Sequence, residues 1–280
     1  MLRLRVITAL ILAPLIIWSV LAFSHRALAI ELGLILTVAA WEWARLAGLQ
    51  ANSARIAFGG FMALIMLGVM VLLHHSMQWL TWFLYANLLW WCIAFVLVAS
   101  FRTTPEQLPR HFDAVAITLN LLAGIVIIGG AFVALTGLHR IESHGAYYIL
   151  MLLVLIWLAD IAAYFAGRRF GKHKLAPYVS PGKTWEGVLG AAIAVLLAAL
   201  LIAGYLQLDT NKTILFSLLV LVTIAVSILG DLTESLFKRR VGVKDSSQLL
   251  PGHGGILDRI DSLMAAAPVF LLGMIQAGIR

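Results

Sequence analysis

The second half of the sequence carries acidic side chains at spacings that helices would bring together. Glu234 and Ser235 follow Asp231 by three and four positions. Asp258 and Asp261 are three positions apart. Residues at such spacings lie on one face of a helix. Two helix ends that present carboxylates in this way could hold a divalent cation, because Mg²⁺ prefers oxygen ligands.

Basic side chains and a glycine-rich turn lie between these acids. The basic residues are Lys238, Arg239, Arg240, Lys244 and Arg259. A turn containing His253, Gly254 and Gly255 precedes the second pair of acids. Glycines let backbone N–H groups approach an anion, and a helix that begins after them attracts negative charge. These side chains suit a metal–polyphosphate complex. A salt-bridge network is the alternative, because with Asp245 the region contains five acidic and five basic residues.

A second charged segment, residues 160–186, carries five basic side chains against two acidic ones, Asp160 and Glu186. Asp160 interrupts an apolar stretch, where an ionisable group is a functional candidate and a hydrogen bond between helices is the alternative. Ser180 and Lys183 lie in a Ser-Pro-Gly-Lys-Thr sequence. Gly182, Lys183 and Thr184 match the end of a P-loop motif, but Pro177 stands where that motif requires its first glycine and no strand is expected before it, so a P-loop is excluded.

The elements that position these residues are expected to be membrane-spanning helices. Of the 280 residues, 62% are hydrophobic and 12% are charged, against roughly 25% charged residues in soluble domains. The mean hydropathy of +0.99 excludes a water-soluble enzyme and intrinsic disorder. Apolar stretches of about 20 residues predict nine spans. They cover approximately 6–23, 27–44, 56–73, 79–99, 115–136, 146–167, 187–207, 213–230 and 260–278.

We therefore expect an all-α, polytopic integral membrane protein with a single transmembrane domain, 1–280. Membrane helices form its N-terminal part, 1–145, and the catalytic part is 146–280 with loops 168–186 and 231–259. The first span is expected to be retained rather than cleaved as a signal peptide. Its 18 apolar residues exceed the usual length of about 7–15 for such a signal.

Basic residues predict the orientation of the chain. If the N-terminus lies in the cytoplasm, 16 of the 20 lysines and arginines lie on the cytoplasmic side. This bias agrees with the preference of Lys and Arg for cytoplasmic loops. Both charged segments then face the cytoplasm. Glu42, near the end of the second span, is interpreted as a structural partner of Arg45.

The charged segments resemble the bacterial members of a known family, the phosphatidate cytidylyltransferases or CDP-diacylglycerol synthases. The first matching stretches run through 171–177 and 180–185. In the later stretch the matching residues are Ser235, Phe237, Lys238, Arg239, Lys244, Asp245, Ser247, Leu250, Pro251, His253, Gly254, Gly255, Ile256, Asp258, Arg259, Ile260 and Asp261. The first 145 residues match mainly in hydropathy and length.

The resemblance implies an Mg²⁺-dependent nucleotidyltransferase of phospholipid biosynthesis. Such enzymes join CTP and phosphatidate into CDP-diacylglycerol and release pyrophosphate. The resemblance further implies K⁺ beside Mg²⁺, a homodimer, and a place in the bacterial inner (cytoplasmic) membrane among membrane lipids. No nucleic-acid partner is expected.

The residues can be given roles in this reaction. Asp231 and Asp258 are expected to hold the metal, with Asp261 as a further ligand or close support. The expected binders of the CTP phosphates are Lys238, Arg239, Lys244, His253, Gly254, Gly255 and Arg259. Lys183, with Ser180 nearby, is expected to steer the lipid phosphate or the leaving group. The expected supporting residues are Asp160, Glu186, Glu234, Ser235 and Asp245.

Two other classes of membrane protein compete with this interpretation. A transporter or channel also places acids within the membrane, but it needs access from both faces. The four basic residues of the opposite side favour chemistry on one side only. A CDP-alcohol phosphotransferase would carry an Asp-x-x-Asp-Gly motif, which the sequence lacks.

Overall fold

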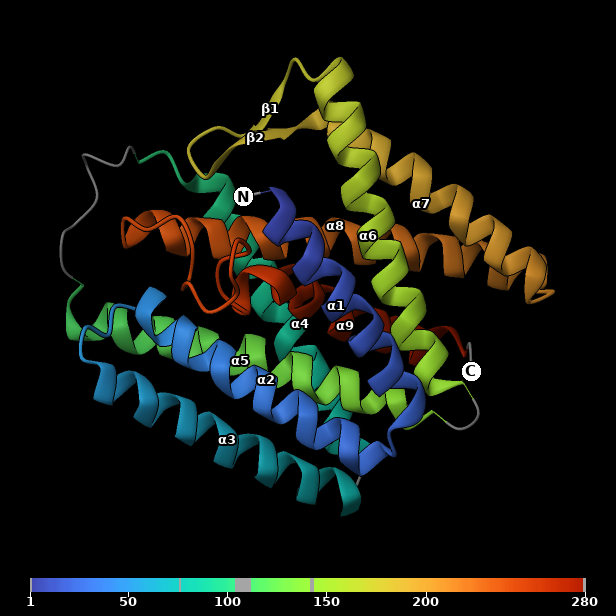
Figure 1. The fold of residues 1–280 in the computed structure, drawn as a ribbon. Coiled ribbons are helices and arrows are strands. Elements are labelled where there is room, and N and C mark those ends of the chain that lie inside the picture. The colour runs from blue at the N-terminus through green and yellow to red at the C-terminus, as the bar shows by residue number, and fades with distance from the viewer. Residues whose placement is uncertain (1, 76, 104–111, 142–143, 279–280) are drawn as a thin grey trace.

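The computed structural model describes residues 2–75, 77–103, 112–141 and 144–278, which form nine α-helices and one β-hairpin (Figure 1). The helices are α1 (Leu2–Ala22), α2 (His25–Leu46), α3 (Asn52–His75), α4 (Met77–Ser100), α5 (Ala114–His139), α6 (Gly145–Phe170), α7 (Trp185–Tyr205), α8 (Thr210–Arg240) and α9 (Leu257–Ala277). The strands are β1 (Lys174–Ala176) and β2 (Ser180–Thr184). The architecture confirms an all-α polytopic membrane protein, and each predicted span overlaps one helix.

Among the described helices, the eight from α2 to α9 are long and apolar enough to cross a membrane. The first helix differs, since its apolar portion in the described part is the shorter Leu10–Ala22. α1 packs against α6, and several of its large apolar side chains stay exposed, among them Leu10, Ile11 and Trp18. In a bilayer these side chains would contact lipid.

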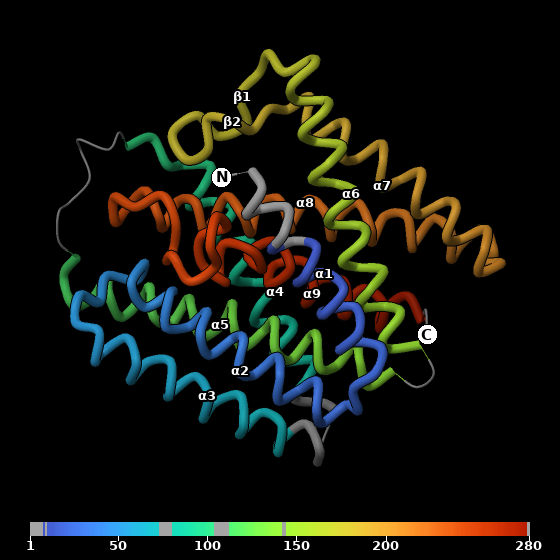
Figure 2. Tube along the Cα trace, viewed as in Figure 1, coloured from blue at the N-terminus to red at the C-terminus, as the bar shows by residue number. Residues whose placement is uncertain are grey.

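Helix pairs organise the bundle, and α9 lies among five other helices. α9 packs along α8 and also contacts α2, α4, α5 and α6. The Cα trace shows α6 and α7 diverging from the β-hairpin, while α2, α3 and α5 lie together on another side of the bundle (Figure 2). α9, which carries Asp258 in its first turn and Asp261 just after it, therefore packs against helices from both halves of the chain.

A close crossing of α8 and α9 occurs at Gly230. A Cβ atom there would lie 2.6 Å from the Cβ of Ala265 and 2.7 Å from the backbone oxygen of Asp261. Any larger residue would push the two helices apart. Glycine at this position thus brings Asp231 of α8 close to Asp261 of α9.

The eighth helix continues well beyond the predicted span. Asp209 accepts a hydrogen bond from the backbone N–H of Lys212 and so caps the start of α8, which then runs for 31 residues to Arg240. The expected helical continuation beyond residue 230 is confirmed. Because α9 begins at Leu257, only residues 241–256 of the expected loop 231–259 lie outside helices.

The expected loop 168–186 contains the β-hairpin. Its antiparallel strands pair Lys174 with Thr184 and Ala176 with Ser180. The backbone oxygen of Val179, at the turn, accepts a hydrogen bond of 3.2 Å from Nε of Arg239. This bond ties the hairpin to the end of α8.

Candidate active site

A cavity of about 760 Å³ combines a charged end with apolar walls. The residues at its polar end are Asp160, Asp231, Lys238, Asp245, His253, Asp258, Arg259, Asp261 and Ser262. Its apolar walls come largely from α1, α2 and α6, and include Ala13, Ile16, Leu32 and Trp157. Eight of the predicted site residues therefore line one space, which apolar side chains also line.

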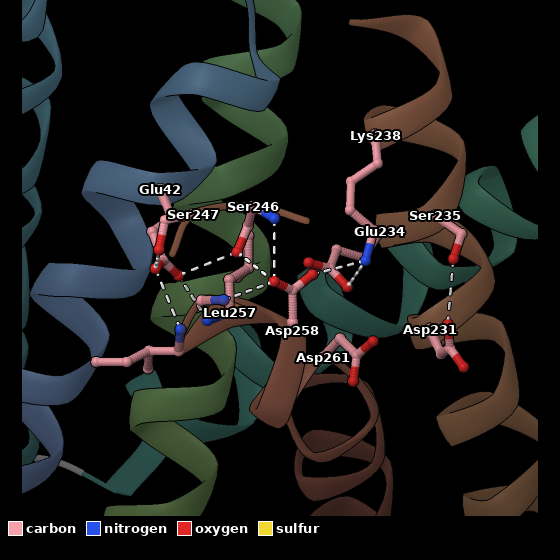
Figure 3. A network of polar contacts seen from close by, with 12 residues as sticks. Glu42, Asp231, Glu234, Ser235, Lys238, Ser246, Ser247, Leu257, Asp258 and Asp261 are labelled. Atoms are coloured by element: carbon pink, nitrogen blue, oxygen red, sulfur yellow. Dashed lines mark hydrogen bonds and ion pairs between the residues drawn. The ribbon is translucent and has the colours of Figure 1, made fainter. Parts of the chain in front are cut away.

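Lys238 joins two carboxylates across α8 and α9. Its Nζ lies 3.0 Å from Oε2 of Glu234 and 2.7 Å from Oδ1 of Asp258 (Figure 3). Glu234 is only 2% exposed, and its Oε1 has no hydrogen-bond donor among the described residues. The carboxyl group of Asp261 lies beside that of Glu234. An ammonium group thus lies where several buried carboxylates attract a cation.

The other oxygen of Asp258 is held by the turn that precedes α9. Oδ2 accepts hydrogen bonds from the backbone N–H groups of Ser246 and Gly255, at 3.0 and 2.8 Å. The Ser246 hydroxyl is 2.9 Å from the same oxygen. Backbone donors therefore fix the carboxylate of Asp258, and its Oδ1 is the oxygen that contacts Lys238.

Lys183 and Asp231 connect the two charged segments of the sequence. Lys183 Nζ is 2.6 Å from Asp231 Oδ2, while the Ser235 hydroxyl donates to Asp231 Oδ1 over 3.2 Å. Asp160 and Lys183 also line a smaller cavity of about 230 Å³ between α6, β2 and α7. Asp160 borders both cavities, and its expected supporting role stays a prediction.

Several predicted site residues lie outside the wall of the large cavity. Glu186 accepts hydrogen bonds from the backbone N–H of His173 and contacts its Nδ1 at 2.6 Å, which holds the hairpin to α7. Lys244 is exposed, and Ser180 belongs to β2. Arg239 reaches the hairpin turn, as described above. Their predicted roles toward CTP or lipid stay predictions.

The glycines of the turn allow carboxylates to approach the backbone. Gly254 has a φ of +84°, and a Cβ atom on it would lie 2.7 Å from Oδ2 of Asp258. At Gly255 a Cβ atom would overlap the Ser246 hydroxyl and the carboxylate of Glu42. Sequence reasoning linked these glycines to phosphate alone and did not anticipate the carboxylates that contact this turn.

Glu42 contacts the turn before α9, and its interpretation as a partner of Arg45 is wrong. Its carboxylate accepts hydrogen bonds from the Ser247 hydroxyl and from the backbone N–H of Leu257. Arg45 instead donates to the backbone oxygen of Ser246 over 3.1 Å. One sequence signal could have identified Glu42, because an acid within an apolar span is a functional candidate by default.

The donor chemistry of the cavity fits Mg²⁺ bound together with a polyphosphate. In the described part of the chain, no three His, Cys, Asp or Glu side chains are grouped closely enough to hold a metal ion alone. Mg²⁺ commonly takes one or two carboxylates and completes its shell with phosphate oxygens and water. Asp231, Asp258 and Asp261 offer carboxylates to one cavity, and the lysine contacts show that this region favours cations.

Comparisons with known proteins identify the family. Residues 3–275 match the family described as the Cytidylyltransferase family. A protein of Pseudomonas aeruginosa named phosphatidate cytidylyltransferase is 42% identical over 278 residues, covering 99% of this chain and 98% of the relative. Proteins of the same name from Haemophilus influenzae and Brucella suis are 37% and 34% identical, covering 96% and 99% of this chain and 97% and 94% of their own length. The resemblance inferred from the charged segments is thereby confirmed, and this chain belongs to the cytidylyltransferase family.

Proposed function

We propose that this chain is a phosphatidate cytidylyltransferase, which converts CTP and phosphatidate into CDP-diacylglycerol and pyrophosphate. The observation that carries the proposal is the cavity with a charged end and apolar walls. The triphosphate of a nucleoside triphosphate is bound by charged side chains, whereas the acyl chains of phosphatidate need an apolar environment. The names of the relatives support the same two substrates.

The reaction transfers the cytidylyl group to the lipid phosphate. An oxygen of phosphatidate forms a bond to the α-phosphorus of CTP, and the bond from that phosphorus to the bridging oxygen of pyrophosphate breaks. Such transfers depend mainly on positioning and on neutralising charge. The attacking phosphate is already anionic, so neither a nucleophilic side chain nor a general base is required.

Positive side chains on three elements would position the phosphates. Lys183 on β2 lies beside Asp231 and near Asp160, where it would steer the lipid phosphate or the leaving pyrophosphate. Lys238 on α8 and Arg259 on α9 line the large cavity and would face the CTP phosphates. Positive charge from separate elements would thus surround the reacting groups.

The metal ion is part of the proposal. Asp231, Asp258 and Asp261 would hold Mg²⁺, which would neutralise the charge that develops on pyrophosphate. To bind the ion through Oδ1, Asp258 has to exchange its contact with Lys238. The ammonium group that is released would become available to a phosphate. An additional K⁺ stays a prediction.

The polar end of the cavity would face the cytoplasm of a bacterial cell. Support comes from the charge bias, because 16 of the 20 basic residues share one side of the membrane in the predicted topology. The predicted homodimer stays a prediction.

Transfer of labelled phosphorus tests the proposed function. Membranes that contain the chain receive phosphatidate, Mg²⁺ and CTP labelled at the α-phosphorus, and the label should enter a chloroform-soluble product. CTP labelled at the γ-phosphorus should leave the label in the aqueous phase as pyrophosphate. If α-label stays aqueous under all these conditions, the proposal is overturned and the transporter is favoured.

A further inference from the structure

The start of α9 lacks a capping side chain of its own. Four other helices begin after residues whose side chains accept a backbone N–H of the first turn, namely Ser24, Asp113, Thr184 and Asp209. Ile256 occupies the equivalent position before α9, has helical backbone angles and provides no such bond. Backbone N–H groups at a helix start require acceptors when they are buried. The acceptor for α9 comes from another helix.

Glu42 of α2 provides that acceptor. Its Oε1 accepts from the backbone N–H of Ile256 over 3.1 Å, and Oε2 accepts from that of Leu257 over 2.6 Å. Glu42 is 1% exposed, and a buried carboxylate is costly without donors. The positive end of the helix dipole favours the charge at this place.

Two serine hydroxyls complete the contacts of Glu42. The hydroxyl of Ser247 donates to Oε1, and that of Ser246 lies 3.3 Å from Oε2. Each oxygen therefore has one backbone donor and one hydroxyl partner. A carboxylate satisfied in this way holds three parts of the chain together: the end of α2, the turn at residues 246–247 and the start of α9.

The same turn orients Asp258. The Ser246 hydroxyl lies between the carboxylates of Glu42 and Asp258, as Figure 3 shows, at 3.3 Å from the first and 2.9 Å from the second. The backbone N–H of Ser246 also donates to Asp258. The absence of a side chain at Gly255 lets both carboxylates approach. Any shift of the turn away from Glu42 would therefore rotate or release Asp258.

We propose that Glu42 is a positioning residue for the transfer reaction. By capping α9 from α2, it holds the Ser246 turn against Oδ2 of Asp258 and leaves Oδ1 directed toward Lys238 and the cavity. This inference rests on the proposed function, in which Asp258 holds the metal ion. It assigns a part in the reaction to α2, in the N-terminal half of the chain, which holds none of the other proposed site residues.

Replacement of Glu42 by glutamine tests the proposal. Glu42→Gln keeps the size of the side chain but directs an NH₂ group at donors. We expect kcat to fall about 10²-fold, since small displacements of a reacting group have such effects. We also expect the Mg²⁺ concentration for half-maximal rate to rise at least several-fold. Hydrogen–deuterium exchange should become faster in residues 246–258 of the detergent-purified full chain, independently of any substrate.

The matched control is the same substitution at the other glutamate of α2. Glu31 lies about three helical turns from Glu42, and Glu31→Gln should leave all three measurements unchanged. Wild-type kcat and exchange in Glu42→Gln would overturn the proposal. A lower melting temperature with an unchanged kcat per folded molecule would overturn it too, because Glu42 would then serve stability alone.

Ser247→Ala provides a second test if Glu42→Gln does not accumulate. It removes one donor to Glu42, and it should give smaller changes in the same directions. Unchanged exchange at the start of α9 in this variant would overturn the proposal. A failure of the proposed function is recognised separately, because the wild-type chain would then transfer no label from CTP while the exchange comparison could still be made.

Discussion

Nζ of Lys183 lies 2.6 Å from Oδ2 of Asp231, and this ion pair joins the β-hairpin to α8. The two residues come from the two charged segments that the sequence separates by the whole of α7. Their side chains remain 26% and 34% exposed, so both groups can exchange partners with a bound substrate. The pair places a cation next to the proposed metal ligand.

Replacing Lys183 by alanine should affect activity far more than stability. A partly exposed ion pair contributes about 1 kcal/mol or less to folding, whereas loss of a group that stabilises developing charge costs about 10²-fold in rate. Label transfer from CTP and thermal unfolding in detergent measure the two effects. Lys212→Ala, which removes a half-exposed lysine 4.0 Å from Asp209, is the control and should change neither. Equal rates for both variants would contradict the assignment of Lys183.

Asp258→Asn should abolish most turnover and leave the protein in the membrane. The amide lacks the negative charge that attracts a metal ion and Lys238. Its NH₂ group would also face hydrogen-bond donors, either Lys238 or the N–H groups of Ser246 and Gly255. We expect a loss of rate of about 10³-fold and a loss of about 1–3 kcal/mol in unfolding free energy. Label transfer and an unfolding titration of the solubilised variant check these values. Full activity would contradict the proposed metal ligand.

Gly255→Ala should disturb the turn before α9. The added methyl group would overlap Ser246 and Glu42, and overpacking of this kind costs about 1–3 kcal/mol. The thermal unfolding midpoint should fall, together with the rate of label transfer. Gly60→Ala is the control, because nothing lies within 4 Å of the added atom and alanine favours a helix. A normal midpoint and rate for Gly255→Ala would show that the turn tolerates a side chain.

Filling the apolar wall of the cavity should reduce the use of long acyl chains. Ala13 of α1 lines the cavity, so Ala13→Trp would occupy space proposed for the lipid. We expect a several-fold higher KM for long-chain phosphatidate and a smaller change for a short-chain analogue. Ile11→Trp on the same helix alters a side chain that is 62% exposed, and it should change neither value. A KM for long-chain phosphatidate that is the same in Ala13→Trp and in the wild type would contradict the proposed location of the acyl chains.

Removal of divalent cations should stop the reaction. EDTA is expected to abolish label transfer, and added Mg²⁺ should restore it. Ca²⁺ should restore it poorly, because it requires six to eight oxygen ligands and a looser geometry. Thermal unfolding gives a second measurement, since Mg²⁺ and CTP together should raise the midpoint by binding the folded state. Transfer that persists in EDTA would contradict the metal proposal.

Local patterns in the sequence predict most of the helical architecture. Hydropathy and the helical period depend on neighbouring residues, so they locate the spans and place Asp231 with Ser235 on one face of α8. The β-hairpin is different. Its strands have only three and five residues, and β2 contains proline and glycine, so no alternating pattern marks them.

Long-range contacts account for the part of the site that sequence patterns miss. Glu42 is separated by 204 and 215 residues from its partners Ser246 and Leu257. Helical and strand periodicity relate only residues that are close in the sequence, so they cannot predict this contact. The contact follows from the packing of α2 against α9. The close approach at Gly255 is a consequence of the same contact. A glycine-rich turn predicts close approach, but it does not reveal what approaches.

The length of α8 has a consequence for the kinetics of the reaction. At 1.5 Å per residue, its 31 residues extend for about 46 Å, whereas the hydrocarbon core of a bilayer is about 30 Å thick. The apolar part of α8 ends at Gly230, so with that part across the hydrocarbon core the acids and bases that follow would lie at the depth of the lipid headgroups. Phosphatidate can thus react without leaving its leaflet. Its encounter with the enzyme is two-dimensional, and the rate follows the mole fraction of phosphatidate in the membrane surface rather than its bulk concentration.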